Sequence, residues 1–240
     1  MSERIAVFAS GSGTNLQALI DHFDGSSTAE IALVISDQPG ARARERAEEA
    51  GIQTHHIPVR TRPIAAVTAD TLDALESARI DLVVLAGYVR LVPADVVRRY
   101  AHRVLNIHPA LLPGFGGKGM FGRKVHEAVL EAGCRITGPT VHFVNERYDE
   151  GRIVAQWPVP VLDGDTPETL ADRVLRVEHE LYPAAVEWLA RVLAAAEGEA
   201  EAEAAVREAM PLPVDRGVCF CLGEGIEPDR RGIRRMFGLD

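Results

Sequence analysis

Apolar runs that alternate with segments of helical spacing constrain the fold of this chain more than any other feature. An apolar run at residues 5–9 is followed by a glycine-rich loop and then by apolar residues at helical spacing from Leu16 to Phe23. Further strands are predicted at residues 31–35, 55–59, 81–86 and 104–108, with helices between them at residues 41–50, 68–78 and 93–100. Alternating strands and helices imply a parallel sheet, so the sequence predicts a Rossmann-like, doubly wound α/β fold.

The second half of the chain departs from this alternation. A helix is predicted at residues 123–132, two strands at 140–145 and 152–161 joined by a turn at 149–151, and a long helix from Pro167 to about Ala196. We expect Pro183 to kink or divide that helix. The sheet is therefore expected to be mainly parallel, with C-terminal antiparallel strands and a long final helix. Residues 1–197 are predicted to form one domain, and residues 198–240 an appended tail, first acidic and then irregular from Pro211.

Composition excludes several classes of protein. The 240 residues are 47% hydrophobic and 25% charged, which is ordinary for a globular chain. The net charge of −9 argues against a surface that binds nucleic acid or anionic membrane. No apolar run approaches the roughly 20 residues that span a bilayer, and the N-terminus lacks signal-peptide architecture. Three cysteines are too few for a disulfide framework, and the pair at Cys219 and Cys221 has no second Cys/His pair nearby. We expect a cytoplasmic protein without a metal.

The loop at residues 11–15, GSGTN, is the first candidate site. It lies between the first predicted strand and the first predicted helix, where glycines allow close approach of an anion and the amides of the helix N-terminus are unpaired. The loop is not a Walker motif, and Leu16 stands where the dinucleotide fingerprint has its third glycine. By itself, the pattern fits either a phosphate site or a tight turn.

Polar residues at the end of the fifth strand form the second candidate site. Asn106 and His108 are two residues apart, so their side chains project from the same face at the carboxyl end of the strand. An amide donor and an imidazole there can stabilise an oxyanion, although a histidine beside Pro109 can also serve local structure. Asp149, in the later turn, could raise the pKa of such an imidazole and orient it, but alone it reads as a turn residue.

Five segments together resemble the phosphoribosylglycinamide formyltransferases, folate-dependent enzymes of purine biosynthesis. They are SGSGTNLQAL at 10–19, VVLAGYVRL at 83–91, LNIHPALLP at 105–113, GPTVHFV at 138–144 with Asp149, and VEHELYP at 177–183. The resemblance covers roughly residues 4–192. The Asn-x-His-Pro element with a later Asp is common to folate-dependent formyltransferases and hydrolases, whereas the glycine loop with Thr14 and Asn15 points to the ribonucleotide enzymes.

The resemblance implies a formyltransferase fold in residues 1–197 and transfer of the formyl group from 10-formyltetrahydrofolate to the amine of phosphoribosylglycinamide. Small-molecule substrates, with 10-formyltetrahydrofolate as co-substrate and no metal, are expected, and the oligomeric state is left open. By similarity to the family, the catalytic residues are Asn106, His108 and Asp149. The implied substrate-binding residues are Gly13, Thr14, Asn15 and Glu178, and the implied folate-binding residues are Val89, Arg90, Leu91, Val92 and Asn106.

Some positions depart from the family pattern or read as structural. Residues 114–120 replace the usual aromatic-Pro-Gly turn, and Leu175 stands where many relatives have a polar residue. Residues 59–68 do not align cleanly, so no folate-contacting arginine is assigned there. Arg90 could meet a folate carboxylate or extend to solvent. His142 and His179, and the pair at residues 55–56, are read as structural.

Four alternatives compete with this interpretation. Two use the same chemistry: a 10-formyltetrahydrofolate hydrolase, and a formyltransferase for another amine acceptor such as methionyl-tRNA or a sugar nucleotide. The hydrolase normally carries an N-terminal regulatory domain and the tRNA enzyme a basic C-terminal module, whereas residues 193–210 are acidic. A nicotinamide-dependent oxidoreductase would use Asp37 on a ribose, and a non-enzymatic binding module would use the fold alone.

Overall fold

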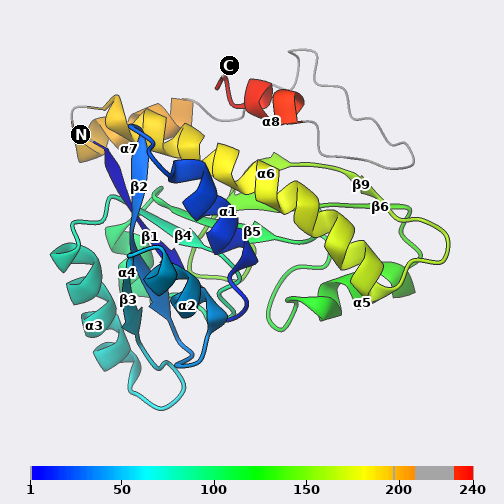
Figure 1. The fold of residues 1–240 in the computed structure, drawn as a ribbon, viewed down its shortest axis with the longest axis horizontal. Coiled ribbons are helices and arrows are strands. Elements are labelled where there is room, and N and C mark those ends of the chain that lie inside the picture. Colours follow the sequence, from blue (N-terminus) through cyan, green and yellow to red (C-terminus); the bar gives the residue numbers. More distant parts are fainter. Residues whose placement is uncertain (1, 197, 209–229, 240) are drawn as a thin grey trace.

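A seven-stranded sheet forms the centre of the molecule (Figure 1). The computed structural model describes residues 2–196, 198–208 and 230–239. The seven strands are β1 (Glu3–Phe8), β2 (Ala29–Ser36), β3 (Gln53–His56), β4 (Leu82–Leu85), β5 (Val104–His108), β7 (Thr140–Phe143) and β8 (Ile153–Gln156). Their order across the sheet is β3-β2-β1-β4-β5-β7-β8. Neighbours from β3 to β5 are parallel, and the β5-β7 and β7-β8 pairs are antiparallel, which confirms the predicted fold class.

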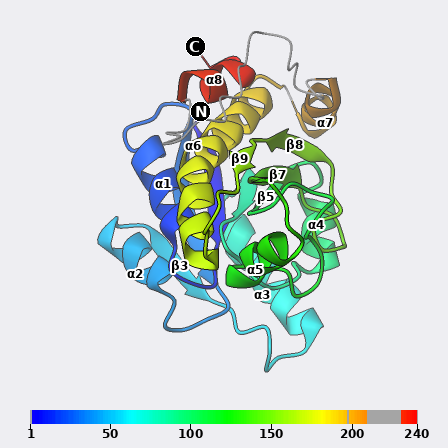
Figure 2. The ribbon, with the colours of Figure 1, turned by 90° about the vertical axis from the view of Figure 1, so that its right-hand side faces the viewer.

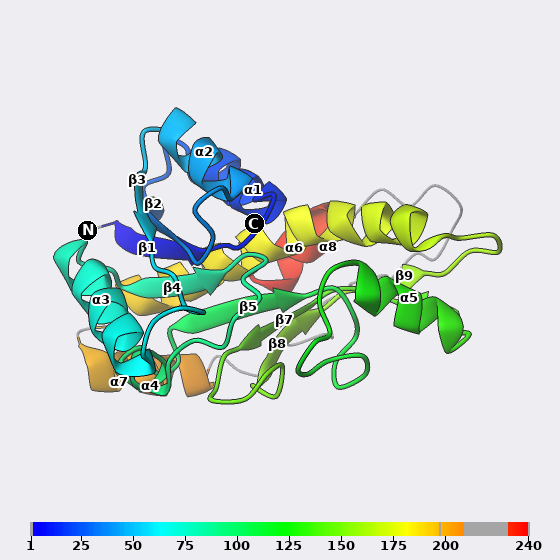
Figure 3. The same cartoon turned by 90° about the horizontal axis from the view of Figure 1, so that it is seen from below.

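Helices cover both faces of the sheet (Figures 2 and 3). They are α1 (Thr14–Phe23), α2 (Arg42–Glu49), α3 (Ile64–Ser77), α4 (Ala94–Arg99), α5 (Arg123–Glu131) and α6 (Pro167–Ala194). Figure 3 shows α1, α2 and α6 on one face and α3 and α4 on the other. No helix within the described ranges is both long enough and apolar enough to span a membrane.

Strand β1 explains why two cores form. Its side chains alternate, so that Ile5 and Val7 pack in the cluster with α1 and α6, while Ala6 and Phe8 pack in the cluster with α3 and α4. All four residues are at most 1% exposed. An apolar run without polar alternation is typical of a strand buried on both faces.

The strand predicted at residues 152–161 is wrong as a single element. Residues Ile153–Gln156 form β8, whereas Val159–Pro160 form a separate strand, β9, which pairs with β6 (Ile136–Thr137) in a two-stranded sheet. Pro158 lies between the two strands, and a proline cannot donate a ladder hydrogen bond. The two-residue strand β6 was not predicted, because so short an element leaves no periodic signal.

Pro183 does not divide α6. The helix runs without interruption from Pro167 to Ala194, beginning with a capping box in which Thr166 and Thr169 exchange hydrogen bonds. The residues on both sides of the proline, Tyr182 and Ala184, are at most 2% exposed. Proline cannot donate a backbone hydrogen bond, so Pro183 costs the helix one such bond. The stabilisation from packing α6 against the sheet offsets this loss.

The last part of the chain contains two more helices, α7 (Glu199–Glu208) and α8 (Arg230–Met236). The expectation of an irregular segment is therefore wrong for residues 230–236, and Cys219 and Cys221 lie outside the described residues. Ile233, Met236 and Phe237 are buried in the same cluster as α6. Figure 1 shows α8 beside α6. The Phe237 and Trp188 rings lie 6.2 Å apart between centroids. The short run between Arg230 and Leu239 thus buries apolar surface of the main core.

We expect Phe237→Ala to lower the free energy of unfolding by about 3 kcal/mol, because it removes a buried aromatic side chain and leaves a cavity beside Trp188. Urea unfolding followed by tryptophan fluorescence measures this. The control, Arg231→Ala, changes an exposed residue of the same helix and should leave stability within about 0.5 kcal/mol. Equal stability of the two variants would mean that α8 does not pack on α6.

Candidate active site

A cavity of about 470 Å³ opens at the carboxyl ends of β1, β4 and β5. Ligands bind at this edge in open α/β sheets. Its walls come from the glycine loop, the segment after β4, the end of β5, the 117–123 loop, the 148–149 turn and the first half of α6. Of the predicted site residues, Thr14, Asn15, Val89, Asn106, His108, Asp149 and Glu178 line this cavity.

The glycine loop turns into α1 at Gly13. This residue is the N-cap of α1 and has a φ of 71°, which is left-handed backbone. A Cβ at position 13 would lie 2.7 Å from Cα of Ala43 in α2, so both the conformation and the packing require glycine. Gly13 itself does not line the cavity, whereas Ser12 and Thr14 on either side do. The first turn of α1 therefore presents its unpaired amides at the cavity.

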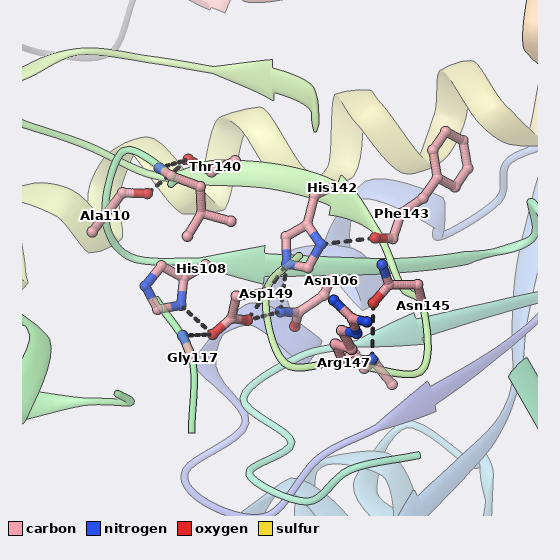
Figure 4. A network of polar contacts seen from close by, with 12 residues as sticks. Asn106, His108, Ala110, Gly117, Thr140, His142, Phe143, Asn145, Arg147 and Asp149 are labelled. Atoms are coloured by element: carbon pink, nitrogen blue, oxygen red, sulfur yellow. Dashed lines mark hydrogen bonds and ion pairs between the residues drawn. The ribbon is translucent and has the colours of Figure 1, made fainter. Parts of the chain in front are cut away.

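Asn106, His142 and Asp149 form a partly buried polar network (Figure 4). Asn106 on β5 is directly opposite His142 on β7 in the antiparallel register. Nδ2 of Asn106 lies 3.0 Å from Nε2 of His142 and 3.4 Å from Oδ1 of Asp149. Nδ1 of His142 lies 2.8 Å from the carbonyl oxygen of Phe143 and donates to it, so Nε2 is the ring nitrogen that faces Asn106. This contact fixes which end of the Asn106 amide faces β7.

His108 lies between two acceptors. Its Nε2 is 2.8 Å from the Phe115 carbonyl oxygen, and its Nδ1 is 3.7 Å from Oδ2 of Asp149 (Figure 4). The same Asp149 oxygen accepts a 2.8 Å hydrogen bond from the Gly117 amide. The structure therefore brings Asn106, His108 and Asp149 together, and the 115–117 backbone holds two of them.

Burial decides the charge of the imidazole. It lowers the pKa of His108 below the usual value of 6.5, although Asp149 and the Phe115 carbonyl both act to raise it. The carboxylate of Asp149 alone would raise the pKa of His108, which is the direction expected from the sequence. Burial also acts to raise the pKa of Asp149, but His142, the Gly117 amide and the charge of His108 outweigh it and leave that pKa below its usual value.

Glu178 is a buried carboxyl group at the α6 wall of the cavity. One oxygen accepts a 2.6 Å hydrogen bond from Nδ2 of Asn15. The residue is 7% exposed, and burial raises the pKa of Glu178 while the Asn15 contact acts to lower it. Asn15 and Glu178 thus join the glycine loop to α6, as expected if both face one substrate.

The four predicted folate-binding residues after β4 point in different directions. Val89 lines the cavity, and Val92 is 2% exposed in the core beneath α3 and α4. Leu91 is 40% exposed. The Arg90 side chain turns away from the cavity, and its Nε lies 2.8 Å from Oδ2 of Asp37. Asp37 is therefore paired with Arg90. This argues against the nicotinamide-dependent oxidoreductase, in which Asp37 would bind a ribose.

Sequence reasoning missed other residues at the cavity, among them Tyr88, Tyr148 and His126. His126, on α5, is 4% exposed, and its Nδ1 is buried without a hydrogen-bond partner among the described residues. Burial lowers the pKa of His126, and the charge of His108 acts in the same direction. No spacing rule identifies it, because only the packing of α5 places it beside His108. Leu175 also lines the cavity and makes that part of the α6 wall apolar.

Within residues 2–196, 198–208 and 230–239 there is no cluster of three or more His, Cys, Asp or Glu side chains that could hold a metal ion.

Glu178→Gln should raise stability at neutral pH by about 1 kcal/mol, because it removes the cost of burying a charge. A carboxyl group whose pKa is raised on folding favours the folded state below its unfolded pKa, and that advantage is lost as the pH rises through its folded pKa. The difference in stability between Glu178→Gln and the parent protein should therefore be smaller at pH 4 than at pH 7. Thermal unfolding at pH 4 and pH 7 measures both effects, with exposed Glu131→Gln as the control. If Glu178→Gln is less stable than the parent protein at pH 7, the description of Glu178 as a carboxyl group whose charged form is costly to bury is wrong.

Comparison with known proteins agrees with the geometry. Residues 3–186 match the Formyl transferase family model. A relative named phosphoribosylglycinamide formyltransferase, chloroplastic, from Arabidopsis thaliana is 46% identical over 183 residues, which are 75% of this chain and 63% of that protein. The chain thus matches less than two thirds of this relative's length. A phosphoribosylglycinamide formyltransferase from Haemophilus influenzae is 38% identical over 78% of this chain and 86% of its own length.

Solved structures give the same result. Glycinamide ribonucleotide transformylase 1 from Symbiobacterium toebii superposes with a TM-score of 0.74 at 42% identity, covering 80% of this chain and 89% of that one. A formyltetrahydrofolate deformylase from Pseudomonas syringae pv. tomato superposes with a TM-score of 0.72 at 27% identity, covering 80% of this chain and 63% of that one. The family match spans most of the chain and includes every residue of the cavity network, so the chain belongs to the formyl transferase family.

Proposed function

We propose that this protein transfers the formyl group of 10-formyltetrahydrofolate to the amine of phosphoribosylglycinamide, giving formylglycinamide ribonucleotide and tetrahydrofolate. The observation that carries the proposal is the meeting of Asn106, His108 and Asp149 in a cavity that the glycine loop also lines. The relatives named phosphoribosylglycinamide formyltransferase support the choice of acceptor.

The reaction forms one C–N bond and breaks another. The substrate amine attacks the formyl carbon, a tetrahedral oxyanion develops, and the bond from that carbon to N10 of the folate breaks as a proton passes from the amine to N10. Donors placed at an oxyanion in a dry site stabilise it strongly. Asn106 and His108 would supply them from one strand face, and each would release a partner to do so. For Asn106 this partner is the Asp149 carboxylate at 3.4 Å, and for His108 it is the Phe115 carbonyl at 2.8 Å.

Asp149 has two roles in this proposal. Its charge acts against the burial of His108 and so increases the fraction of imidazolium. Its 3.7 Å contact with Nδ1 also orients the ring, whose Nε2 lies 2.8 Å from the Phe115 carbonyl oxygen. Both roles need an ionised carboxylate, in agreement with the lowered pKa of Asp149.

Different parts of the cavity wall are assigned to the two substrates. We assign the ribonucleotide phosphate and ribose to Gly13, Thr14 and Asn15, where amides at the start of α1 meet the cavity. We assign the glycinamide amine to Glu178, which a protonated or neutral amine can approach as a hydrogen-bond partner. The folate is assigned to the 89–92 segment and Asn106. Of the side chains in that segment only Val89 lines the cavity, so Arg90, Leu91 and Val92 would contribute backbone groups.

The proposal also covers the setting of the reaction. Residues 1–197 would be the catalytic domain, with 198–240 appended, and 10-formyltetrahydrofolate a co-substrate used without a metal. The substrates are small molecules, nucleic acid and membrane are not partners, and the protein acts in the cytoplasm. The net charge of −9 and the three cysteines support this setting.

Purified protein assayed with 10-formyltetrahydrofolate, with and without phosphoribosylglycinamide, tests the proposal. We expect turnover only when both are present. Turnover without the ribonucleotide would identify a 10-formyltetrahydrofolate hydrolase, the activity named for the Pseudomonas neighbour. No turnover in either case would point to another amine acceptor.

His108→Ala should lower kcat by about 100-fold or more, because the oxyanion loses a donor. Binding of tetrahydrofolate, measured by calorimetry, should change little. His56→Ala is the matched control, since it removes an exposed imidazole from the edge strand β3. Unchanged kcat in His108→Ala would refute the assignment of this residue.

Asp149→Asn should shift the pH profile of kcat/KM. Asp149 acts to raise the pKa of His108, so its loss lowers that pKa further. If imidazolium is the active form, the limb on which activity falls as pH rises moves to lower pH. Glu150→Gln, an exposed change in the same turn, should leave the profile in place. If the pH profile does not move in Asp149→Asn, Asp149 has no effect on His108 during the reaction and is a turn residue only.

A further inference from the structure

Asp37 is a buried carboxylate that no step of the proposed reaction uses. It follows β2 and lies outside the cavity, and its side chain is 1% exposed. Its Oδ2 is 2.8 Å from Nε of Arg90 and 2.7 Å from Nε2 of Gln38. A buried charge that is paired in this way fixes the position of its partners, because separating them leaves an uncompensated charge.

The pair joins two loops that leave the sheet at different strands. Arg90 follows β4, Asp37 follows β2, and β1 lies between those strands, so Arg90 reaches across the end of β1. Ser10 lies between β1 and the glycine loop, directly before Gly11. Its hydroxyl oxygen accepts the Val89 amide at 3.1 Å, and its own amide donates to the Gly87 carbonyl at 3.2 Å. The start of the glycine loop is therefore enclosed by the segment after β4 and by Asp37.

The charges around Asp37 agree with this arrangement. Burial acts to raise the pKa of Asp37, but Ser10, Arg90 and Gln38 together outweigh it, so the group stays ionised. After burial, the charge of Asp37 is the next cause that raises the pKa of Tyr88, which lines the cavity and packs edge-on against Phe8 at 5.4 Å. One carboxylate thus acts on Ser10, Tyr88 and Arg90.

We propose that Asp37 is a positioning residue that holds the glycine loop and the 87–90 segment in register, and so acts on the binding of both substrates while touching neither. The inference rests on the proposed function, in which the glycine loop takes the ribonucleotide phosphate and the segment after β4 takes the folate. It also changes the role of Arg90, whose guanidinium serves the pair with Asp37.

The test is direct binding by calorimetry, with phosphoribosylglycinamide and tetrahydrofolate each titrated alone into the full chain. Asp37→Asn keeps the shape and removes the charge. Arg90→Gln removes the other partner, and because the Arg90 side chain is 21% exposed it should fold even if the first variant does not. Each variant should raise both dissociation constants by roughly 2-fold to 30-fold, the range found for residues that act through others. The double variant should lose no more binding affinity than either single variant, because both substitutions break the same Asp37–Arg90 pair.

Asp95→Asn is the control, since it removes an exposed carboxylate that is paired with an arginine elsewhere on the surface. It should leave both constants unchanged. A loss of folate binding alone would make Arg90 an ordinary folate ligand and overturn the proposal, as would losses that add in the double variant. If the unaltered protein binds neither compound, the proposed function itself fails, and the inference fails with it.

Discussion

The antiparallel pairing of β5 with β7 is the interaction on which the rest of the site depends. It ends the parallel part of the sheet and sets Asn106 opposite His142 and His108 opposite Thr140. Because β7 then returns as β8 through the turn that holds Asp149, the carboxylate comes back beside the two residues of β5. The residues that we propose as oxyanion donors, and the carboxylate proposed to orient them, are thus brought together by strand register, which a one-residue slip would destroy.

Three carboxyl groups with little exposure have different environments. Asp149 and Glu178 line the cavity, whereas Asp37 lies outside it. Asp37 and Asp149 have enough donors around them for their pKa values to fall, so both remain ionised. Glu178 has one amide donor, and its pKa rises. Each costs stability that an apolar residue would not. For Asp149 and Glu178 this cost falls at the candidate active site.

Much of the fold follows from sequence pattern, and the site follows in part. Residues 104–108 were predicted as a strand with the observed bounds, and the spacing of Asn106 and His108 placed both on one face. Asp149 was tied to them only through family resemblance, because a turn residue has no periodicity that reveals its neighbours. The direction of the His108 pKa shift depends on burial, and the place of His126 depends on how α5 packs. Those are tertiary properties, like the continuity of α6 through Pro183.

The most direct measurement follows the formyl carbon itself. The protein would be incubated with phosphoribosylglycinamide and with 10-formyltetrahydrofolate that carries carbon-13 in the formyl group, and the label followed by NMR. The account predicts that the label appears in the formamide of the ribonucleotide as the folate is consumed, with no release of free formate. Label recovered as formate, or left on the folate, would contradict the claim that this cavity brings the two substrates together for transfer.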